Sequence, residues 1–139
     1  MNHNSHNDEA GRRRRIFLVD RHTLMRRAAA GWINQCSELE VCGTAGRMAN
    51  AFHAVRQLRP DLVVSEIMRP QDLGFIRELH RRHPGLPILV FSIQDPELFG
   101  ARARRAGARG FLTKAAGGGQ LVNRIRALLR NGSRRPTAR

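Results

Sequence analysis

Four short apolar runs in this chain each end on a polar or charged side chain. Runs of Val, Ile, Leu and Phe that alternate with helix-like segments are typical of a fully buried parallel sheet. Because parallel strands all finish at the same edge, the polar side chains should converge in one crevice, where open α/β sheets bind ligands. The four side chains are those of Asp20, Glu66, Ser92 and Lys114.

Lys114 is unusual for a compositional reason as well. The chain has 25 lysines and arginines, and Lys114 is the only lysine among them. Arginine evidently serves wherever a positive charge alone is needed, so a position that keeps lysine favours a role for a compact ammonium on a flexible stem. The place of Lys114 at the end of an apolar run supports this interpretation over chance.

The order of the expected elements indicates one α/β domain. Helix-like and strand-like segments alternate along the chain, which predicts a doubly wound parallel sheet with right-handed crossovers. Thr23 and Asp95 are the expected N-caps of two helices, and Gly107 is an expected helix stop. The expected strands are 15–20, 40–45, 62–66, 88–92 and 110–113, and the expected helices are 24–36, 49–58, 74–82, 96–106 and 120–130.

The two ends of the chain differ from the rest in composition. Residues 1–13 are polar and we expect them to be disordered, residues 14–131 form the predicted domain, and residues 132–139 form a basic tail or the start of a linker to a DNA-binding effector. The sequence lacks both a run of about 20 apolar residues and a signal-peptide h-region. We therefore expect a cytoplasmic protein with no membrane partner.

The formal net charge of +14 raises the question of nucleic-acid binding. The arginines are scattered over every expected helix, and the chain has no tyrosine that would interleave with them and stack on bases. We therefore do not expect specific DNA binding. A basic nucleic-acid-binding regulator stays open as an alternative, and its mark would be a steep salt dependence of affinity.

Four segments together resemble the receiver domain of two-component response regulators, most closely the NarL/FixJ-type subfamily, whose members carry a C-terminal helix-turn-helix. The segments are IFLVDRHTLMRR, LRPDLVVSEIMRP, PILVFSIQDPE and RAGARGFLTKA, and the likeness covers residues 14–131. The resemblance implies a flavodoxin-like sheet of order 2-1-3-4-5. It also implies a phosphoryl-accepting aspartate after the third strand and, after the first strand, an acidic pair that holds Mg²⁺.

The resemblance assigns roles to individual residues. Asp20 matches the first acid of the pair, Ser92 the hydroxyl that reports phosphorylation, and Lys114 the lysine that contacts the phosphoryl group. Phe111 falls at the aromatic position that turns inward or outward with activation. The loop after the third strand is matched by Pro70 and Gly74.

Two positions depart from the family pattern. Arg21 replaces the second acid of the pair, and Glu66 stands at the phosphoacceptor position. The extra methylene of glutamate moves the carboxylate by more than about 1 Å, and such a displacement can cost about 10²-fold in a positioned reaction. Arg21 removes an oxygen ligand that Mg²⁺ prefers and adds a cation that repels it. We therefore expect no ordinary phosphorylation, no bound Mg²⁺ and no other cofactor.

A cluster of Glu66, Lys114 and Arg21 offers a physical alternative to phosphorylation. Glu66 extends its charge toward where a phosphoryl group would lie, Lys114 pairs with it, and Arg21 replaces the charge of the metal. Our hypothesis is a receiver locked near one state by this cluster. Two alternatives stay open: a degenerate site in a domain kept as a dimerisation scaffold, and a phosphorylatable receiver with weak activity.

The resemblance also implies how a signal would leave the domain. In the family, output passes through the face made by residues 96–106, 110–113 and 120–130, which often dimerises. Because this face is strongly basic here, we expect an acidic protein partner, either a sensor kinase or an effector. We therefore expect a protein–protein interaction module and not an enzyme. The expected output residues are Phe111, Leu98, Arg102, Arg105, Thr113 and Arg124.

Overall fold

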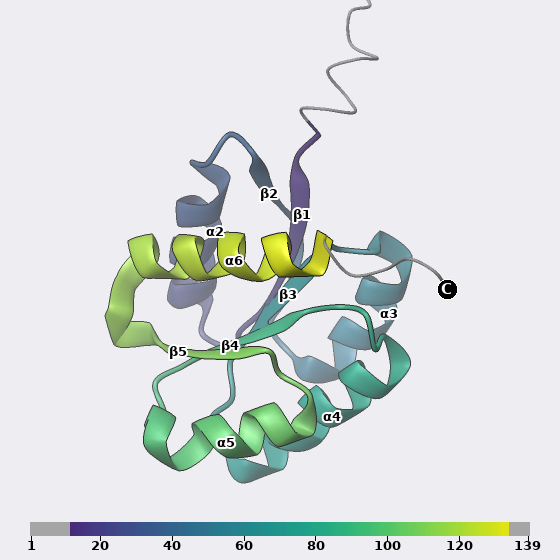
Figure 1. Cartoon of the computed structure of the whole chain (residues 1–139), viewed down its shortest axis with the longest axis vertical. Helices are drawn as coiled ribbons and strands as arrows, with labels where there is room; N and C mark the ends of the chain where they lie inside the picture. Colours follow the sequence, from purple (N-terminus) through teal and green to yellow (C-terminus); the bar gives the residue numbers. More distant parts are fainter. Residues whose placement is uncertain (1–11, 134–139) are drawn as a thin grey trace, which may run out of the picture.

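The computed structural model describes residues 12–133 and shows a five-stranded parallel sheet of order β2-β1-β3-β4-β5 (Figure 1). This order confirms the flavodoxin-like (βα)5 fold that the alternation and the resemblance predicted. The expected tails at residues 1–11 and 134–139 lie outside the described residues. The strands are β1 Arg14–Val19, β2 Leu39–Ala45, β3 Leu62–Ser65, β4 Ile88–Ser92 and β5 Gly110–Thr113.

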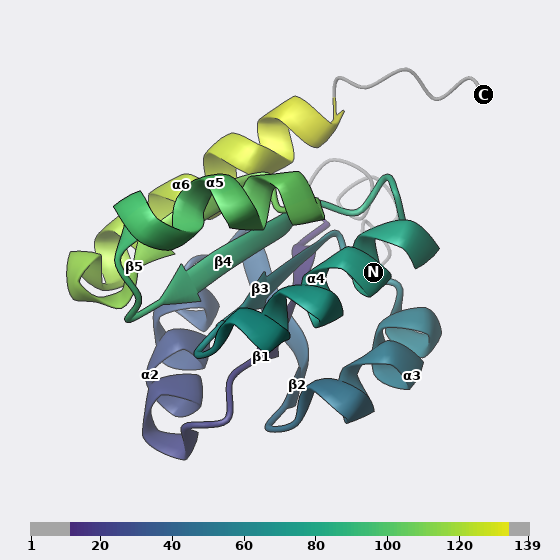
Figure 2. The ribbon, with the colours of Figure 1, turned by 90° about the horizontal axis from the view of Figure 1, so that it is seen from below.

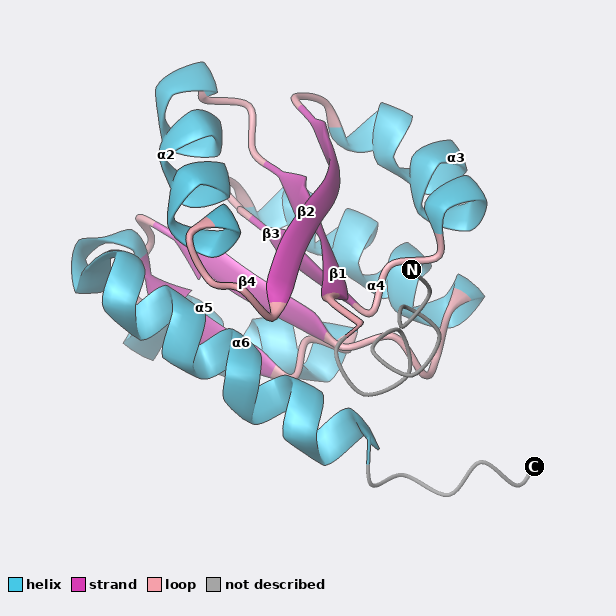
Figure 3. Cartoon of the chain, turned by 90° about the horizontal axis from the view of Figure 1, so that it is seen from above, coloured by secondary structure: helices cyan, strands magenta, loops and turns pink. Residues whose placement is uncertain are grey.

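The helices cover both faces of the sheet. Two of them pack on one face (Figure 3) and three on the other (Figure 2), so the strands are buried on both sides. The two helices on the first face are α2 Thr23–Asn34 and α6 Gly117–Ser133. The three on the second face are α3 Met48–Leu58, α4 Leu73–Arg82 and α5 Pro96–Ala106. Two short turns, η1 Pro70–Asp72 and η2 Lys114–Ala116, follow β3 and β5.

The alternation of side chains along β1 divides the core into two layers. Phe17 and Val19 pack under α3, α4 and α5, whereas Ile16 and Leu18 pack under α2 and α6. All four are almost completely buried. Because successive strand residues point to opposite faces, an apolar run with no polar interruption is what a central strand of such a sheet requires.

The helix termini agree with the sequence in part. Asp95 caps α5, since its side chain accepts a hydrogen bond from the Glu97 amide at 2.9 Å, and Gly107 ends α5 at a φ of 124°. The expected cap at Thr23 is wrong: Thr23 is already helical, and His22 precedes α2 without a side-chain cap bond.

The last helix is longer than expected, because it begins at Gly117 and continues to Ser133 instead of spanning 120–130. A Cβ atom on Gly118 would lie 2.5 Å from the indole ring of Trp32. Glycine at this position therefore lets the first turn of α6 lie close against α2. The three consecutive glycines at 117–119 therefore form the first turn of α6. Within the described chain, no helix is both long and apolar enough to cross a membrane.

Candidate functional site

The four polar residues at the ends of the apolar runs lie along the carboxyl edge of the sheet. Asp20, Glu66 and Lys114 directly follow β1, β3 and β5, and Ser92 is the last residue of β4. All four are buried, with exposed fractions of 9% or less. Buried ionisable groups need partners of opposite charge, so the contacts among these side chains define the site.

Lys114 holds the first carboxylate of the site. Its Nζ atom lies 2.8 Å from Oδ2 of Asp20 and 3.6 Å from Oε1 of Glu66. The expected pairing of Lys114 with Glu66 is therefore present as the longer of two contacts. The closer partner is Asp20 at the end of β1, although β3, which carries Glu66, lies nearer to β5 in the order of the strands.

Arg21 holds the second carboxylate. Its Nε atom lies 2.7 Å from Oε2 of Glu66, and its backbone amide donates a hydrogen bond to the same oxygen at 2.9 Å. The other oxygen, Oε1, is buried and accepts no hydrogen bond from the described residues. One oxygen of Glu66 is thus fully engaged, while the other faces Lys114 at 3.6 Å and the Nδ1 atom of His22 at 3.5 Å.

Asp72 is a member of the site that the sequence analysis missed. It is 5% exposed, and its Oδ2 accepts hydrogen bonds from the amides of Met68 and Arg69 and from Nη2 of Arg21, at 2.7, 3.1 and 3.1 Å. Burial acts to raise the pKa of Asp72, but these hydrogen bonds and the charge of Arg21 outweigh it, so the pKa lies below its ordinary value. Arg21 therefore bridges two buried carboxylates.

His22 also belongs to the site. Its Nδ1 atom lies 3.2 Å from Oδ1 of Asp20, and its backbone amide donates to the same oxygen at 2.9 Å. Asp20, His22 and Glu66 offer ligand atoms that all lie within 4.8 Å of one another. This is the group in the described chain that could hold a metal ion, although the cationic groups of Lys114 and Arg21 contact its two carboxylates.

Ser92 has hydrogen-bond partners of its own. Its hydroxyl donates to the carbonyl of Ile67 at 2.6 Å and accepts from the amide of Gln94 at 3.0 Å. The Gln94 side chain in turn donates to the carbonyl of Met68 at 2.6 Å. Ser92 therefore links the loop after β4 to the loop after β3. The loop after β3 runs from Glu66 to Asp72 and so contains both carboxylates that Arg21 contacts.

The expected output residues occupy one side of the molecule. Phe111 is buried, with 6% exposure, so its ring is turned inward. Leu98 is 67% exposed on α5, and Arg102 on the same helix stacks over the ring of Phe99 at 5.4 Å. The remaining residues are Arg105, which is exposed, and Thr113 and Arg124, which are half-buried.

Comparison with known proteins identifies the family. The model of the response regulator receiver domain family matches residues 16–126. The chain belongs to this family. The receiver domain accounts for the order of the strands and for the position of Asp20, Glu66, Ser92 and Lys114 at one edge of the sheet.

Similar proteins include a response regulator and a transcriptional activator. The response regulator GacA of Pseudomonas viridiflava is 31% identical over 114 residues, which are 81% of this chain and 53% of that protein. The DNA-binding transcriptional activator DevR/DosR of Mycobacterium tuberculosis is 32% identical over 114 residues, 81% of this chain and 52% of that protein. This receiver domain thus spans about half the length of the curated relatives it matches.

Solved structures agree with the fold. A two-component response regulator of the LuxR family from Aurantimonas sp. SI85-9A1 superposes with a TM-score of 0.80 at 28% identity, over 86% of each chain. The signal receiver domain of NarL from Mycobacterium tuberculosis gives a TM-score of 0.76 at 22% identity, over 88% of this chain and 98% of that one. Both structures share the receiver fold of this chain.

Proposed function

We propose that this receiver domain works as a protein–protein interaction module of two-component signal transduction, without phosphorylation and without Mg²⁺. The observation that carries the proposal is the arrangement of two built-in cations on the two acidic residues. Lys114 contacts Asp20 at 2.8 Å and Arg21 contacts Glu66 at 2.7 Å. The pairs occupy the place where, by the family resemblance, a metal ion and a phosphoryl group would meet.

The donor set does not fit Mg²⁺. This ion prefers an octahedral shell of oxygen atoms, yet two of the carboxylate oxygens at the site, Oδ2 of Asp20 and Oε2 of Glu66, already face an ammonium and a guanidinium. A divalent cation placed there would repel both groups and would leave the buried ammonium of Lys114 without its partner. The positive charge that a metal would supply is thus supplied by side chains.

The position of Glu66 also opposes acyl phosphate formation. A carboxylate must attack phosphorus in line, with its reacting oxygen free and well positioned. Oε2 of Glu66 accepts from both the side chain and the backbone of Arg21, and the residue is only 2% exposed. The carboxylate is therefore held as a structural anion.

The ion pairs of the acidic site would hold the domain in one conformation, and its function would then lie in the contacts that its surface makes. The basic face around α5, β5 and α6 is suited to an acidic protein surface, either a sensor kinase or an effector, or to a second copy of the domain. We propose a role in transcription regulation in the cytoplasm, with no enzymatic activity of the domain itself.

One observation favours a second candidate function, a receiver that is phosphorylated weakly on Glu66. The Oε1 atom of Glu66 accepts no hydrogen bond from the described residues, and Lys114 stands 3.6 Å from it. An oxygen left in this way would be the nucleophile if the site opened.

Mass spectrometry separates the two candidates. After incubation of the protein with acetyl phosphate and Mg²⁺, we expect the intact mass to stay unchanged. A response regulator with aspartate at the acceptor position, treated in parallel, gives the positive control. A labile gain of one phosphoryl group that is lost in the Glu66→Gln variant would overturn the proposal and establish the weak phosphoacceptor.

A further inference from the structure

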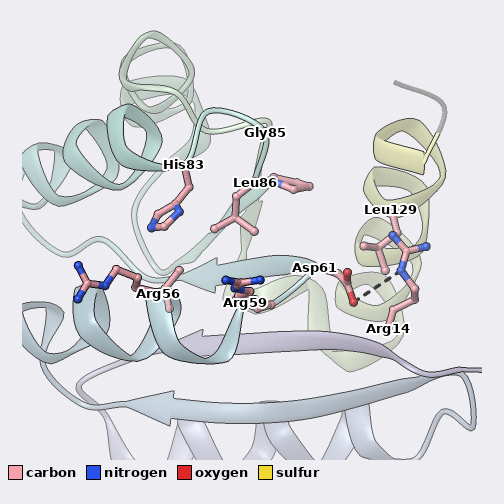
Figure 4. A pocket seen from close by; sticks show the side chains of 11 residues that line it. Arg14, Arg56, Arg59, Asp61, His83, Gly85, Leu86 and Leu129 are labelled. Carbon is pink, nitrogen blue, oxygen red and sulfur yellow. Dashed lines mark ion pairs between the residues drawn. The ribbon is translucent and has the colours of Figure 1, made fainter. Parts of the chain in front are cut away.

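A second candidate binding site lies at the opposite edge of the sheet from the acidic site. A pocket of about 570 Å³ opens where β1, β3 and β4 begin, between the end of α3 and the loop that leads into β4 (Figure 4). The size falls within the range of small-molecule sites, which is about 300–1,000 Å³. Its lining residues are Arg14, Val55, Arg56, Arg59, Pro60, Asp61, His83, Gly85, Leu86, Pro87 and Leu129.

Basic side chains reach this pocket from three separate parts of the chain. Arg56 and Arg59 come from the end of α3, Arg14 from the start of β1, and His83 from the end of α4. Figure 4 shows the arginines of α3 on one side of the hollow and His83 on the other. Groups that converge from distant segments make a concave anion site, unlike the charges along one solvated helix.

The one carboxylate in the lining does not neutralise the arginines of α3. Oδ2 of Asp61 accepts a hydrogen bond from the Arg15 amide at 2.7 Å and lies 3.8 Å from Nε of Arg14. The side chains of Arg56 and Arg59 make no ion pair with any described residue. Two guanidinium groups at the mouth of the pocket are therefore available to an anionic ligand.

The backbone at Arg59 supports this interpretation. Arg59 is the C-cap of α3 with a φ of 50°, and among the described residues it is the only non-glycine residue with positive φ. Glycine or asparagine usually holds this position at a helix end, because a larger side chain is strained there. The presence of arginine at a position suited to glycine favours a function for its side chain.

The remaining walls are apolar and suit a flat organic group. Leu86 is half-buried, and Pro87, Val55 and Leu129 are buried, so they form a surface that phosphate alone would not use. Arginine binds phosphate in a bidentate manner and also stacks on aromatic rings. Positive charge beside an apolar wall thus matches a phosphorylated molecule with a planar ring.

We propose that this pocket binds a nucleoside diphosphate, with the phosphates on Arg56 and Arg59 and the base against the apolar wall. The proposal does not depend on the acidic site, which lies at the other edge of the sheet. A ligand bound here would contact α3 and the loop between α4 and β4. It would therefore act on the domain at a place separate from the acidic site.

Isothermal titration calorimetry of the full chain with ADP, adenosine and inorganic pyrophosphate at about 0.15 M salt tests the proposal. We expect saturable ADP binding, with adenosine and pyrophosphate each at least about tenfold weaker. The R56Q/R59Q variant should lose at least about tenfold in ADP affinity. The matched control R27Q/R77Q, which removes two exposed arginines from α2 and α4, should change it by less than about twofold.

Three results would overturn the proposal. They are the absence of saturable ADP binding, pyrophosphate binding as tight as that of ADP, and an equal loss in both double variants. The last result would show that the net charge of the chain attracts the anion without a defined site. Thermal unfolding of each variant checks that it is folded before titration.

Discussion

The ammonium of Lys114 lies 2.8 Å from the carboxylate of Asp20, although the two residues are separated by almost the whole domain in sequence. Both side chains are buried, so their contact offsets part of the cost of removing two charged groups from water. In this receiver domain the ion pair joins the end of β1 to the end of β5, across two intervening strands. The contact is therefore structural as well as a feature of the candidate site.

The first prediction concerns Lys114→Met. The substitution keeps much of the side-chain volume but leaves Asp20 and Glu66 facing each other without a shared cation, so we expect a loss of about 3–5 kcal/mol in the free energy of unfolding. Urea denaturation at pH 7 measures the loss. Arg77→Met, at an exposed position of α4, is the control and should change stability by less than about 0.5 kcal/mol. A loss at Lys114 as small as that of the control would contradict the structural role.

The second prediction concerns Asp72. Its carboxylate has a pKa below the ordinary value of 3.8, so the folded state favours its charged form. The resulting stability is fully present above the unfolded pKa and is lost as the pH falls through the folded pKa. Asp72→Asn should cost about 2 kcal/mol at pH 7 and clearly less near pH 3. Urea denaturation of both proteins at the two pH values gives the comparison, and a difference that does not shrink at low pH would refute the assignment.

The third prediction concerns the contact between Gly118 and Trp32. A Cβ atom at position 118 would lie 2.5 Å from the indole ring, so Gly118→Ala should destabilise the domain by about 1–3 kcal/mol. Gly119 is the matched control, because a Cβ atom there meets nothing within 4 Å. Gly119→Ala should raise stability by up to about 1 kcal/mol, since alanine is the better helix former. Thermal or urea unfolding decides the sign for each variant.

The fourth prediction reverses the two departures from the family pattern. In the R21D/E66D variant the new carboxylate at position 21 completes the acidic pair with Asp20, and the acceptor carboxylate becomes shorter. We therefore expect saturable Mg²⁺ binding at about millimolar concentration. It should also gain mass on treatment with acetyl phosphate. The single variant E66D retains the Arg21 guanidinium and should bind Mg²⁺ no better than the original chain. Equal Mg²⁺ affinity in all three proteins would show that Arg21 does not exclude the ion.

Particular residues show how far the sequence predicted the site. Asp20, Glu66, Ser92 and Lys114 were placed at one edge of the sheet because each follows an apolar run, and parallel strands end at the same edge. The sequence did not predict Asp72. Its role depends on the turn η1, which directs its carboxylate toward the amides of Met68 and Arg69, and no periodic pattern encodes such a turn.

The sequence alone determined the (βα)5 architecture and the family, because the period of the apolar residues and the order of the elements depend on local chemistry that any segment carries in itself. Tertiary structure alone decided which charges pair. Lys114 contacts Asp20 more closely than Glu66, and Arg21 bridges Glu66 and Asp72, because distances of a few ångströms follow from the packing of strands and turns that are far apart in the chain. The pocket between α3 and β4 likewise exists only once the separate arginines have been brought together.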